Sequence, residues 1–386
     1  MLSKNISFKN FNKSKVSKKT KLVLKKLLFE NSNLIKSLSR NYKDNYKIGN
    51  IKKLRNNLDV RVIGMGGSAL GTRAIYDLFE ETIPKNFYFI DNLQNKFDFD
   101  SKKNFLNLVV SKSGETLETI SNINIFVKKK DKNIFLTENK NSYIYSLAQK
   151  LKSEIIHHNN FIGGRYSVLS EVGMLPAELM GLKPSKFRQL NNLIKNKKFL
   201  NSLIANVNAI ISMSNNGKSN SIFLNYDPKL RSFLEWYKQL IGESLGKKRK
   251  GILPVISEMP KDNHSVMQLY LDGIKNNFYS FFSLRENRSP KINSSTLLNT
   301  HRFLKNKSVS QIKLYQKKAS ENVFRKKSIP FRSFEILKLD EKTIGELFIF
   351  FILETILIGK ILKINPYNQP AVEIIKSETK KFFNYK

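Results

Sequence analysis

The sequence predicts an α/β protein made of two doubly wound, three-layer (αβα) units with a helical C-terminal tail. The chain has 386 residues, of which 40% are hydrophobic, which is enough for one large or two medium α/β domains. Short apolar runs alternate with helical patterns along most of it, which is typical of parallel sheets covered by helices. Cysteine is absent, so disulfides, thiolate catalysis and Cys-based metal sites are excluded, and a reducing cytoplasm fits.

The expected elements begin with a lysine-rich helical segment at residues 1–55, followed by a first unit at 56–184. Apolar runs in this unit predict strands, and amphipathic stretches between them predict helices. We expect strands at 60–65, 87–91, 105–110 and 133–137, and helices at 69–80, 115–129 and 141–152.

A second unit is expected at 185–345, joined to the first near Pro184, with a helical tail at 346–386. The same patterns predict strands at 221–226, 252–257, 277–284 and 333–339, and helices at 185–212, 228–245, 264–273 and 343–362.

The apolar segment 343–362 is long enough to span a bilayer, but it contains Glu346, Glu354 and Lys360. Each ionised residue deep in a membrane costs about 2.5–3.5 kcal/mol on insertion scales. We therefore interpret the segment as a helix buried by protein and expect no membrane partner. The basic N-terminal residues have too short an apolar run for a secretory signal.

The charge is strongly basic, with 68 Lys and Arg against 31 Asp and Glu, a formal net charge of +37. Such a balance suggests a polyanion partner. The lysines, however, are spread through nearly every segment, and no RNA-binding motif, zinc finger or heptad-plus-basic region is recognisable. We expect no nucleic-acid partner, and the same field would attract a small anionic substrate.

A glycine-rich turn follows the strand expected at 60–65, with Gly64, Gly66, Gly67 and Ser68 ahead of a helix. Such turns let backbone N–H groups close on an anion at the positive end of the helix. A dinucleotide fingerprint would need a further glycine where Ala69 stands. A tight turn that serves only packing is the alternative interpretation.

A hydroxyl-rich turn, Ser-Lys-Ser-Gly-Glu-Thr at 111–116, follows the strand expected at 105–110. Hydroxyls at a helix N-terminus can hold a terminal phosphate, and Lys112 adds a positive charge. The alternative is a simple N-cap, with Glu118 completing a capping box. Both turns should open at the carboxyl edge of one sheet, where ligands bind in such folds.

The turn at 111–116 resembles the phosphosugar-binding signature of sugar isomerase domains, and the two turns together resemble the glucose-6-phosphate isomerase family. The other matching stretches are GGRYSVLSEVGMLPAELMG (163–181), QLIGESLGKKRKGILP (239–254) with DNHSVMQLYLDG (262–273), and INPYNQPAVEIIK (364–376). The resemblance spans residues 60–380 in order. It implies two sugar-isomerase-type subdomains, a tail that completes the active site, and reversible isomerisation of D-glucose 6-phosphate and D-fructose 6-phosphate in glycolysis and gluconeogenesis.

Moving a proton between C1 and C2 through an enediolate requires a carboxylate base, a cation for the oxyanion, and groups that open the ring. By resemblance, Glu243 is the base, Arg165 stabilises the enediolate, and His264 and Lys376 open the ring. The resemblance also implies a cytoplasmic homodimer whose partner supplies the histidine, with no cofactor and no metal. The substrate-binding residues implied are Gly67, Ser68, Ser111, Lys112, Ser113, Thr116, Gln239 and Gln369.

The sequence departs from the family pattern at three positions. Glu115 places a carboxylate near the phosphate turn where the family often has a threonine, and Ile375 and Ala371 replace glycines near Lys376. Two other functions stay open: a bifunctional phosphoglucose/phosphomannose isomerase, and a phosphosugar-binding module without turnover.

Overall fold

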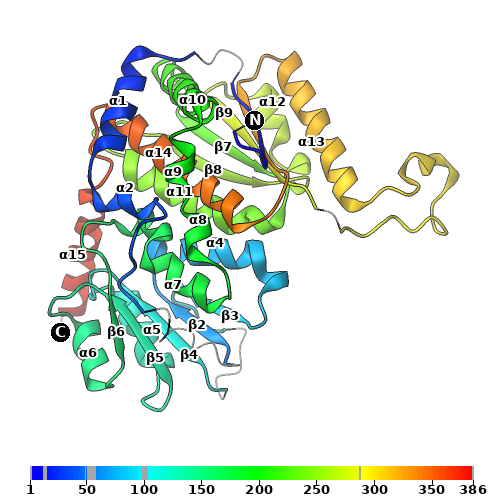
Figure 1. Ribbon diagram of the computed structural model, residues 1–386. Helices are drawn as coiled ribbons and strands as arrows, with labels where there is room; N and C mark the ends of the chain where they lie inside the picture. The colour runs from blue at the N-terminus through cyan, green and yellow to red at the C-terminus, as the bar shows by residue number, and fades with distance from the viewer. Residues whose placement is uncertain are drawn as a thin grey trace.

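The computed structural model describes residues 2–11, 15–47, 49, 58–97, 103–286 and 288–384. Two five-stranded sheets with helices packed against them form the two halves of the molecule, as Figure 1 shows. The α/β class predicted from the sequence is confirmed. The first sheet is drawn in the lower half of the view, and the second sheet in the upper half.

The first sheet has the order β3-β2-β4-β5-β6, and all neighbouring strands in it run parallel. The central strands β2 and β4 are buried along their whole length, as in parallel sheets covered on both faces. The strands are β2 (Val60–Ile63), β3 (Phe87–Ile90), β4 (Leu106–Val110), β5 (Lys132–Thr137) and β6 (Glu154–His157).

The second sheet has the order β1-β10-β9-β7-β8, in which β7 to β10 run parallel and β1 pairs antiparallel with β10. Counted from β8, this order repeats that of the first sheet, with β1 in the position that β6 occupies. The strands are β1 (Ile6–Lys9), β7 (Asn220–Asn225), β8 (Leu253–Glu258), β9 (Asn277–Leu284) and β10 (Phe331–Ile336).

The helices connect and cover the two sheets. From residue 18 to residue 193 they are α1 (Lys18–Phe29), α2 (Asn33–Ser37), α4 (Leu70–Phe79), α5 (Leu117–Phe126), α6 (Tyr143–Lys150), α7 (Glu171–Leu179), α8 (Pro184–Phe187) and α9 (Leu190–Leu193). In the second half they are α10 (Lys197–Asn215), α11 (Arg231–Leu245), α12 (Met267–Asp272), α13 (Val309–Lys326), α14 (Glu341–Ile361) and α15 (Pro370–Asn384). Of the earlier helices, α1, α8 and α9 pack against α14 of the second half. Short 3₁₀ turns are η1 (Gly66–Ser68), η2 (Glu80–Thr82), η3 (Gly164–Leu169), η4 (Pro228–Leu230), η5 (Lys261–His264) and η6 (Asn299–Leu304).

Several local predictions differ from the structure. The lysine-rich N-terminal segment contains a strand, β1, because alternate residues of Ile6–Lys9 face the core beside β10. The single helix expected at 185–212 is three helices, because Arg188 has a non-helical backbone and Asn196 caps a new helix with its side chain. Strand β6 and helix α13 lie where the sequence indicated none. The boundary expected at 55/56 lies outside the described residues, and that at 345/346 lies within α14.

Helix α14 is the apolar segment whose burial the sequence predicted, and every residue from Thr343 to Gly359 is buried. Its carboxylate, Glu354, accepts hydrogen bonds from Arg332 on β10, Asn206 on α10 and Tyr237 on α11. Arg332 also donates to Ser280, at 2.8 Å. These partners explain how a charge is tolerated inside the core. Within the described part of the chain, no helix is long and apolar enough to cross a membrane.

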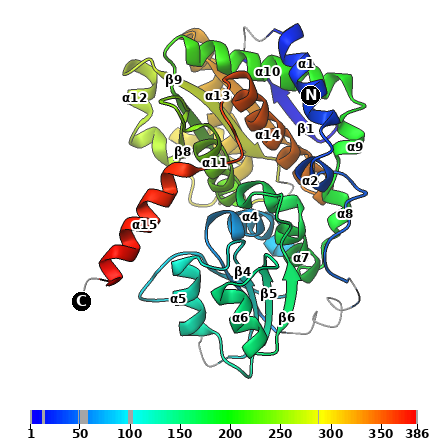
Figure 2. The same cartoon turned by 90° about the vertical axis from the view of Figure 1, so that its left-hand side faces the viewer.

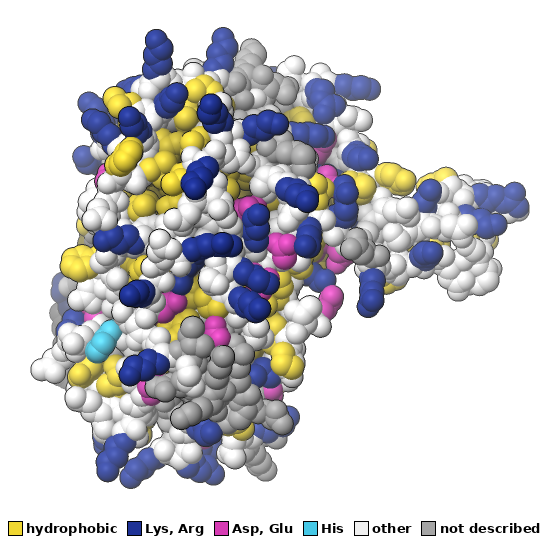
Figure 3. Space-filling view, in the orientation of Figure 1, with side chains coloured by type: hydrophobic (Ala, Val, Ile, Leu, Met, Phe, Trp, Pro, Cys, Tyr) yellow, Lys and Arg dark blue, Asp and Glu magenta, His cyan; other side chains and the backbone are white. Residues whose placement is uncertain are grey.

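The excess positive charge is scattered. Figure 3 shows lysine and arginine side chains distributed over the whole visible face, over both halves of the molecule. On this face the charges do not gather into the single basic stripe that typifies a nucleic-acid interface.

The buried Arg332–Glu354 pair predicts a large effect on stability. Glu354→Gln keeps the side-chain volume but leaves the guanidinium of Arg332 buried without its counter-charge, so the free energy of unfolding should fall by about 3–5 kcal/mol. Chemical denaturation measures this. The matched control is Glu378→Gln, which removes an exposed pair with Lys381 on α15 and should change stability by about 0.5 kcal/mol or less. Equal effects of the two substitutions would contradict the role assigned to the buried pair.

Candidate active site

The glycine turn after β2 packs directly against three other segments. A Cβ atom on Gly67 would lie 2.3 to 2.6 Å from backbone atoms of Gly164 and Arg165, and one on Gly66 would lie 2.7 Å from Nε2 of Gln239. A Cβ on Gly64 would lie 2.7 Å from the carbonyl oxygen of Val110, at the end of β4. Glycine is therefore needed here so that β4, η3 and α11 can all approach the turn.

The hydroxyl-rich turn joins β4 to α5. The hydroxyl oxygens of Ser111 and Thr116 lie 3.2 Å apart, and Ser111 Oγ accepts the N–H of Gly114 at 3.2 Å. Ser113 Oγ accepts the N–H of Glu115 at 3.2 Å. The side chain of Thr116 makes no capping hydrogen bond, so the simple N-cap interpretation does not describe this turn. The first N–H groups of the ten-residue helix α5 therefore lack a side-chain cap and can serve an anion.

The two charged residues of this turn are held by other segments. The ammonium group of Lys112 donates to the carbonyl oxygen of Asn160 at 2.9 Å and lies 3.6 Å from Glu138. Burial lowers its pKa. Glu115, the departure from the family pattern, accepts the N–H of Tyr143 at 2.7 Å, at the start of α6. Its carboxylate is thus engaged by the neighbouring helix.

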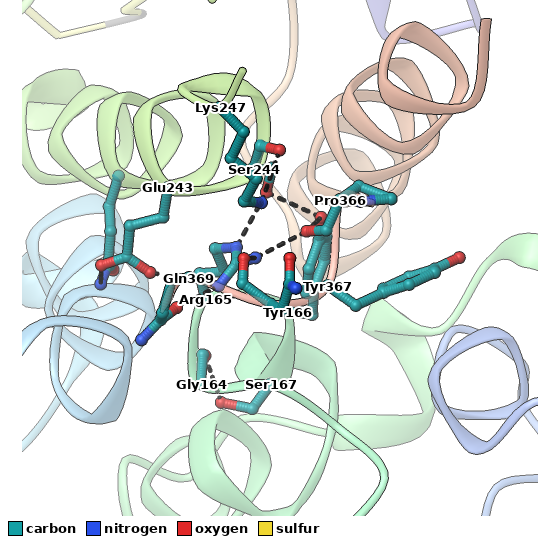
Figure 4. A network of polar contacts seen from close by, with 12 residues as sticks. Gly164, Arg165, Tyr166, Ser167, Glu243, Ser244, Lys247, Pro366, Tyr367 and Gln369 are labelled. Atoms are coloured by element: carbon teal, nitrogen blue, oxygen red, sulfur yellow. Dashed lines mark hydrogen bonds and ion pairs between the residues drawn. The ribbon is translucent and has the colours of Figure 1, made fainter. Parts of the chain in front are cut away.

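Arg165, in η3, is 2% exposed and has hydrogen-bond partners for all of its side-chain nitrogens (Figure 4). Its Nε donates to Ser244 Oγ at 2.8 Å, and its Nη1 lies 3.3 Å from Glu243 Oε2 and donates to Gln369. Its Nη2 donates to the carbonyl oxygens of Pro366, at 2.6 Å, and Asn368, at 3.3 Å. The guanidinium therefore joins η3, α11 and the segment that follows α14.

Glu243 and Gln239 are four residues apart on α11 and so share one face of the helix. Gln239 Nε2 donates to Glu243 Oε1 at 2.8 Å, while Arg165 holds Oε2. The carboxylate is 27% exposed, so it remains accessible to a ligand. This arrangement fixes both oxygens while leaving the group able to accept a proton.

Three further residues belong to this network and were not singled out in the sequence: Tyr166, Ser244 and Lys247. Tyr166 donates to the carbonyl oxygen of Pro366 at 2.9 Å, and its hydroxyl lies 2.8 Å from Ser244 Oγ. Lys247 bonds the carbonyl oxygens of Ser244 and Asn365, at 2.9 and 2.8 Å. The one sequence signal that could have pointed to these three residues is that each lies within four positions of Arg165 or Glu243.

His264 and Lys376 lie apart from this group. His264 is exposed at the end of η5. Lys376 pairs with Glu373 at 2.7 Å on α15, a helix that Figure 2 shows leaving the body of the molecule. Among the described residues, neither forms a hydrogen bond or ion pair with Arg165, Glu243 or Gln369. The structure thus brings together Gly67, Arg165, Gln239, Glu243 and Gln369, with Ser68 in the glycine turn and Ser111, Ser113 and Thr116 in the neighbouring hydroxyl-rich turn.

No group of three or more His, Asp or Glu side chains suited to a metal ion occurs among the described residues. The chemical groups assembled here are a half-buried carboxylate, a permanent cation and two polar turns at the carboxyl edge of a parallel sheet. They can bind a phosphorylated ligand and transfer a proton.

The fold and the assembled groups, together with the family match given below, define a class, the sugar-phosphate isomerases. Two solved structures share the fold. A hypothetical protein from Thermus thermophilus superposes with a TM-score of 0.83 at 21% sequence identity, and the match covers 95% of this chain and 94% of that one. A glucose-6-phosphate isomerase from Chlamydia trachomatis superposes with a TM-score of 0.74 at 18% identity, and the match covers 99% of this chain and 89% of that one.

The chain belongs to the phosphoglucose isomerase family, whose sequence profile matches residues 30–384. It is 34% identical over 340 residues to a glucose-6-phosphate isomerase from Methanocaldococcus jannaschii, with 83% of each chain covered.

The close approach at Gly67 predicts that Gly67→Ala is destabilising. The added methyl group would push on the Gly164–Arg165 backbone, at a cost of about 1–3 kcal/mol. The control is Gly242→Ala on α11, where nothing lies within 4 Å of the added Cβ and a helical alanine should be neutral or stabilising. Denaturation midpoints measure both. A tolerated Gly67→Ala would show that the turn and η3 can move apart freely.

Proposed function

We propose that the protein catalyses the reversible isomerisation of D-glucose 6-phosphate and D-fructose 6-phosphate through an enediolate. The observation that carries the proposal is the carboxylate of Glu243, whose two oxygens are held by Gln239 and Arg165 while the group stays partly exposed. Family membership supports the same reaction.

The phosphate group would bind at the turn between β4 and α5. Hydroxyls of Ser111, Ser113 and Thr116 and the uncapped N–H groups of α5 supply donors there, and the positive end of the helix favours a dianion. Ser68 and Gly67 border the same sheet edge. The phosphate would thus anchor the substrate, and the rest of the sugar would extend towards α11.

Glu243 would remove the proton from one carbon of the C1–C2 pair and return it to the other. The charge that develops on the substrate oxygen would be stabilised by the guanidinium of Arg165. Gln369, to which Arg165 donates a hydrogen bond, would bond sugar hydroxyls. The bonds of Arg165 to Ser244 and to two backbone carbonyl oxygens would hold the guanidinium in place, while a substrate oxygen would take the place of one of the acceptors at Nη1.

Ring opening would use His264 and Lys376, and we propose that a homodimer assembles the complete site. His264 is exposed, and α15, which carries Lys376, has exposed Ile374, Ile375, Phe382 and Phe383 side chains. Exposed apolar groups of this size on one helix favour contact with another surface. The absence of cysteine fits a cytoplasmic setting for this reaction.

A coupled assay that converts fructose 6-phosphate to glucose 6-phosphate tests the proposal directly. Mannose 6-phosphate, run in parallel, decides whether the activity extends to the phosphomannose reaction. Binding without turnover of any of these sugars would instead indicate a phosphosugar-binding module.

The role of Glu243 predicts the result of Glu243→Gln. The amide keeps the shape and the contact with Gln239 but cannot accept the proton, so kcat should fall by about 10²–10⁴-fold or more with little change in substrate affinity. Exchange of the C2 proton with deuterated solvent measures this step. Glu235→Gln, on the same helix and similarly exposed beside Lys238, should leave exchange unchanged. Exchange at the wild-type rate in Glu243→Gln would exclude this residue as the base.

The shared site predicts complementation between two inactive chains. When His264→Ala and Glu243→Gln chains are mixed and allowed to exchange, each heterodimer carries one site with both substitutions and one with neither. For random pairing, activity should return to about a quarter of the wild-type value if the sites are independent. No recovery, despite exchange confirmed with a tagged subunit, would mean that each chain builds its own complete site.

A further inference from the structure

Lys247 connects the helix that carries Glu243 to the segment that carries Gln369. It lies just beyond the end of α11, and its ammonium group donates to the carbonyl oxygen of Ser244 at 2.9 Å and to that of Asn365 at 2.8 Å. Ser244 belongs to the last turn of α11, and Asn365 lies within the connection between α14 and α15, residues 362–369. One side chain thus bonds two segments more than a hundred residues apart in the sequence.

The connection at 365–369 has no regular secondary structure, so side chains from other segments fix its backbone. Arg165 holds the carbonyl oxygens of Pro366 and Asn368, and Tyr166 also bonds that of Pro366. Lys247 is the donor on the N-terminal side of these contacts. Its loss would free the start of the connection, whose other end places Gln369 against Arg165.

The backbone directly after Lys247 forms a tight turn through two residues with left-handed φ values. Lys247 and Lys250 exchange two backbone hydrogen bonds, at 3.1 and 2.9 Å, around a two-residue turn. The central residues Lys248 and Arg249 have φ values of 54° and 58°, as in a type I′ turn that normally contains Asn or Gly. Left-handed backbone at such residues costs on the order of 1–3 kcal/mol each and persists where surrounding contacts impose it.

Lys247 also lies within the electrostatic reach of the catalytic group. Burial and the charge of Arg165 lower its pKa to about 8, while Glu243 acts in the opposite direction. Placing a second cation close to Arg165 is unfavourable unless hydrogen bonds compensate. The two carbonyl bonds supply that compensation.

We propose that Lys247 is a positioning residue that locks the 365–369 connection against the end of α11, so that Gln369 meets Arg165 and Glu243 in the geometry that binds the sugar. This role rests on the proposed isomerase function. Lys247 acts through Gln369 and does not itself contact the substrate.

The test compares Lys247→Met, Lys247→Arg and a control, Lys248→Met, whose side chain is exposed on the same turn. Loss of charge-assisted hydrogen bonds should lower kcat/KM by about 10–100-fold in Lys247→Met, chiefly through KM, because Gln369 contacts the sugar. Lys247→Arg keeps a charged donor and should restore most of the activity. Lys248→Met should resemble the wild type.

A double-mutant cycle with Gln369→Ala identifies the path of the effect. If Lys247 acts through Gln369, the double variant should lose little more than Gln369→Ala alone. The proposal would be overturned if the activity losses of Lys247→Met and Gln369→Ala multiply in the double variant. It would also be overturned if Lys247→Arg fails to restore activity, or if Lys248→Met loses as much activity as Lys247→Met.

Hydrogen exchange of the amides at 365–369 provides a readout that does not depend on turnover. Faster exchange in Lys247→Met but not in Lys248→Met would support the clamp, and unchanged exchange would refute it. If the wild-type protein isomerises neither sugar phosphate, the proposed function fails, while the exchange data still decide whether Lys247 holds the connection.

Discussion

The buried guanidinium of Arg165 is the constraint on which the site depends. Removing this cation from water is costly unless every donor is paired, and the pairing requires η3, α11 and the connection after α14 to meet at one point. The glycine turn after β2 has to lie flat against the same backbone. Three segments from distant parts of the sequence are thereby joined by the hydrogen bonds of one side chain, and the glycine turn packs against the backbone of the same residue.

The two halves of the molecule contribute different components to this junction. The first sheet supplies the glycine and hydroxyl turns at its carboxyl edge, and the second half supplies α11 with its carboxylate. Contacts of α11 with α4, η1 and η3 fix one half against the other. The turn at 111–116, where we propose that the phosphate binds, and Glu243, the proposed base, thus belong to separate units, and the spacing between them is set by how these units pack.

The sequence was sufficient to predict the parallel strands and both turns, because hydrophobic runs and glycine or hydroxyl clusters are local signals. The sequence was not sufficient to predict three other elements. Strand β1 forms because it pairs with the distant strand β10, and β6 is a short strand at the edge of its sheet. Helix α13 buries Lys317 and Glu321, so its apolar pattern is weak. The partners of Arg165 at 366–369 lie about 200 residues away, and no local pattern indicates them. Roles for His264 and Lys376 came from resemblance alone, and their geometry stays a prediction.

The pairing of β1 with β10 has a consequence for how the chain is made. Ile6 and Ile336 lie opposite each other in one sheet, although more than three hundred residues separate them in the sequence. During translation β1 therefore has no partner until β10 has been synthesised, so the second sheet can close only after the whole first sheet has been made. The lysines around β1 are well suited to that interval, because repulsion between their charges disfavours premature association of nascent chains.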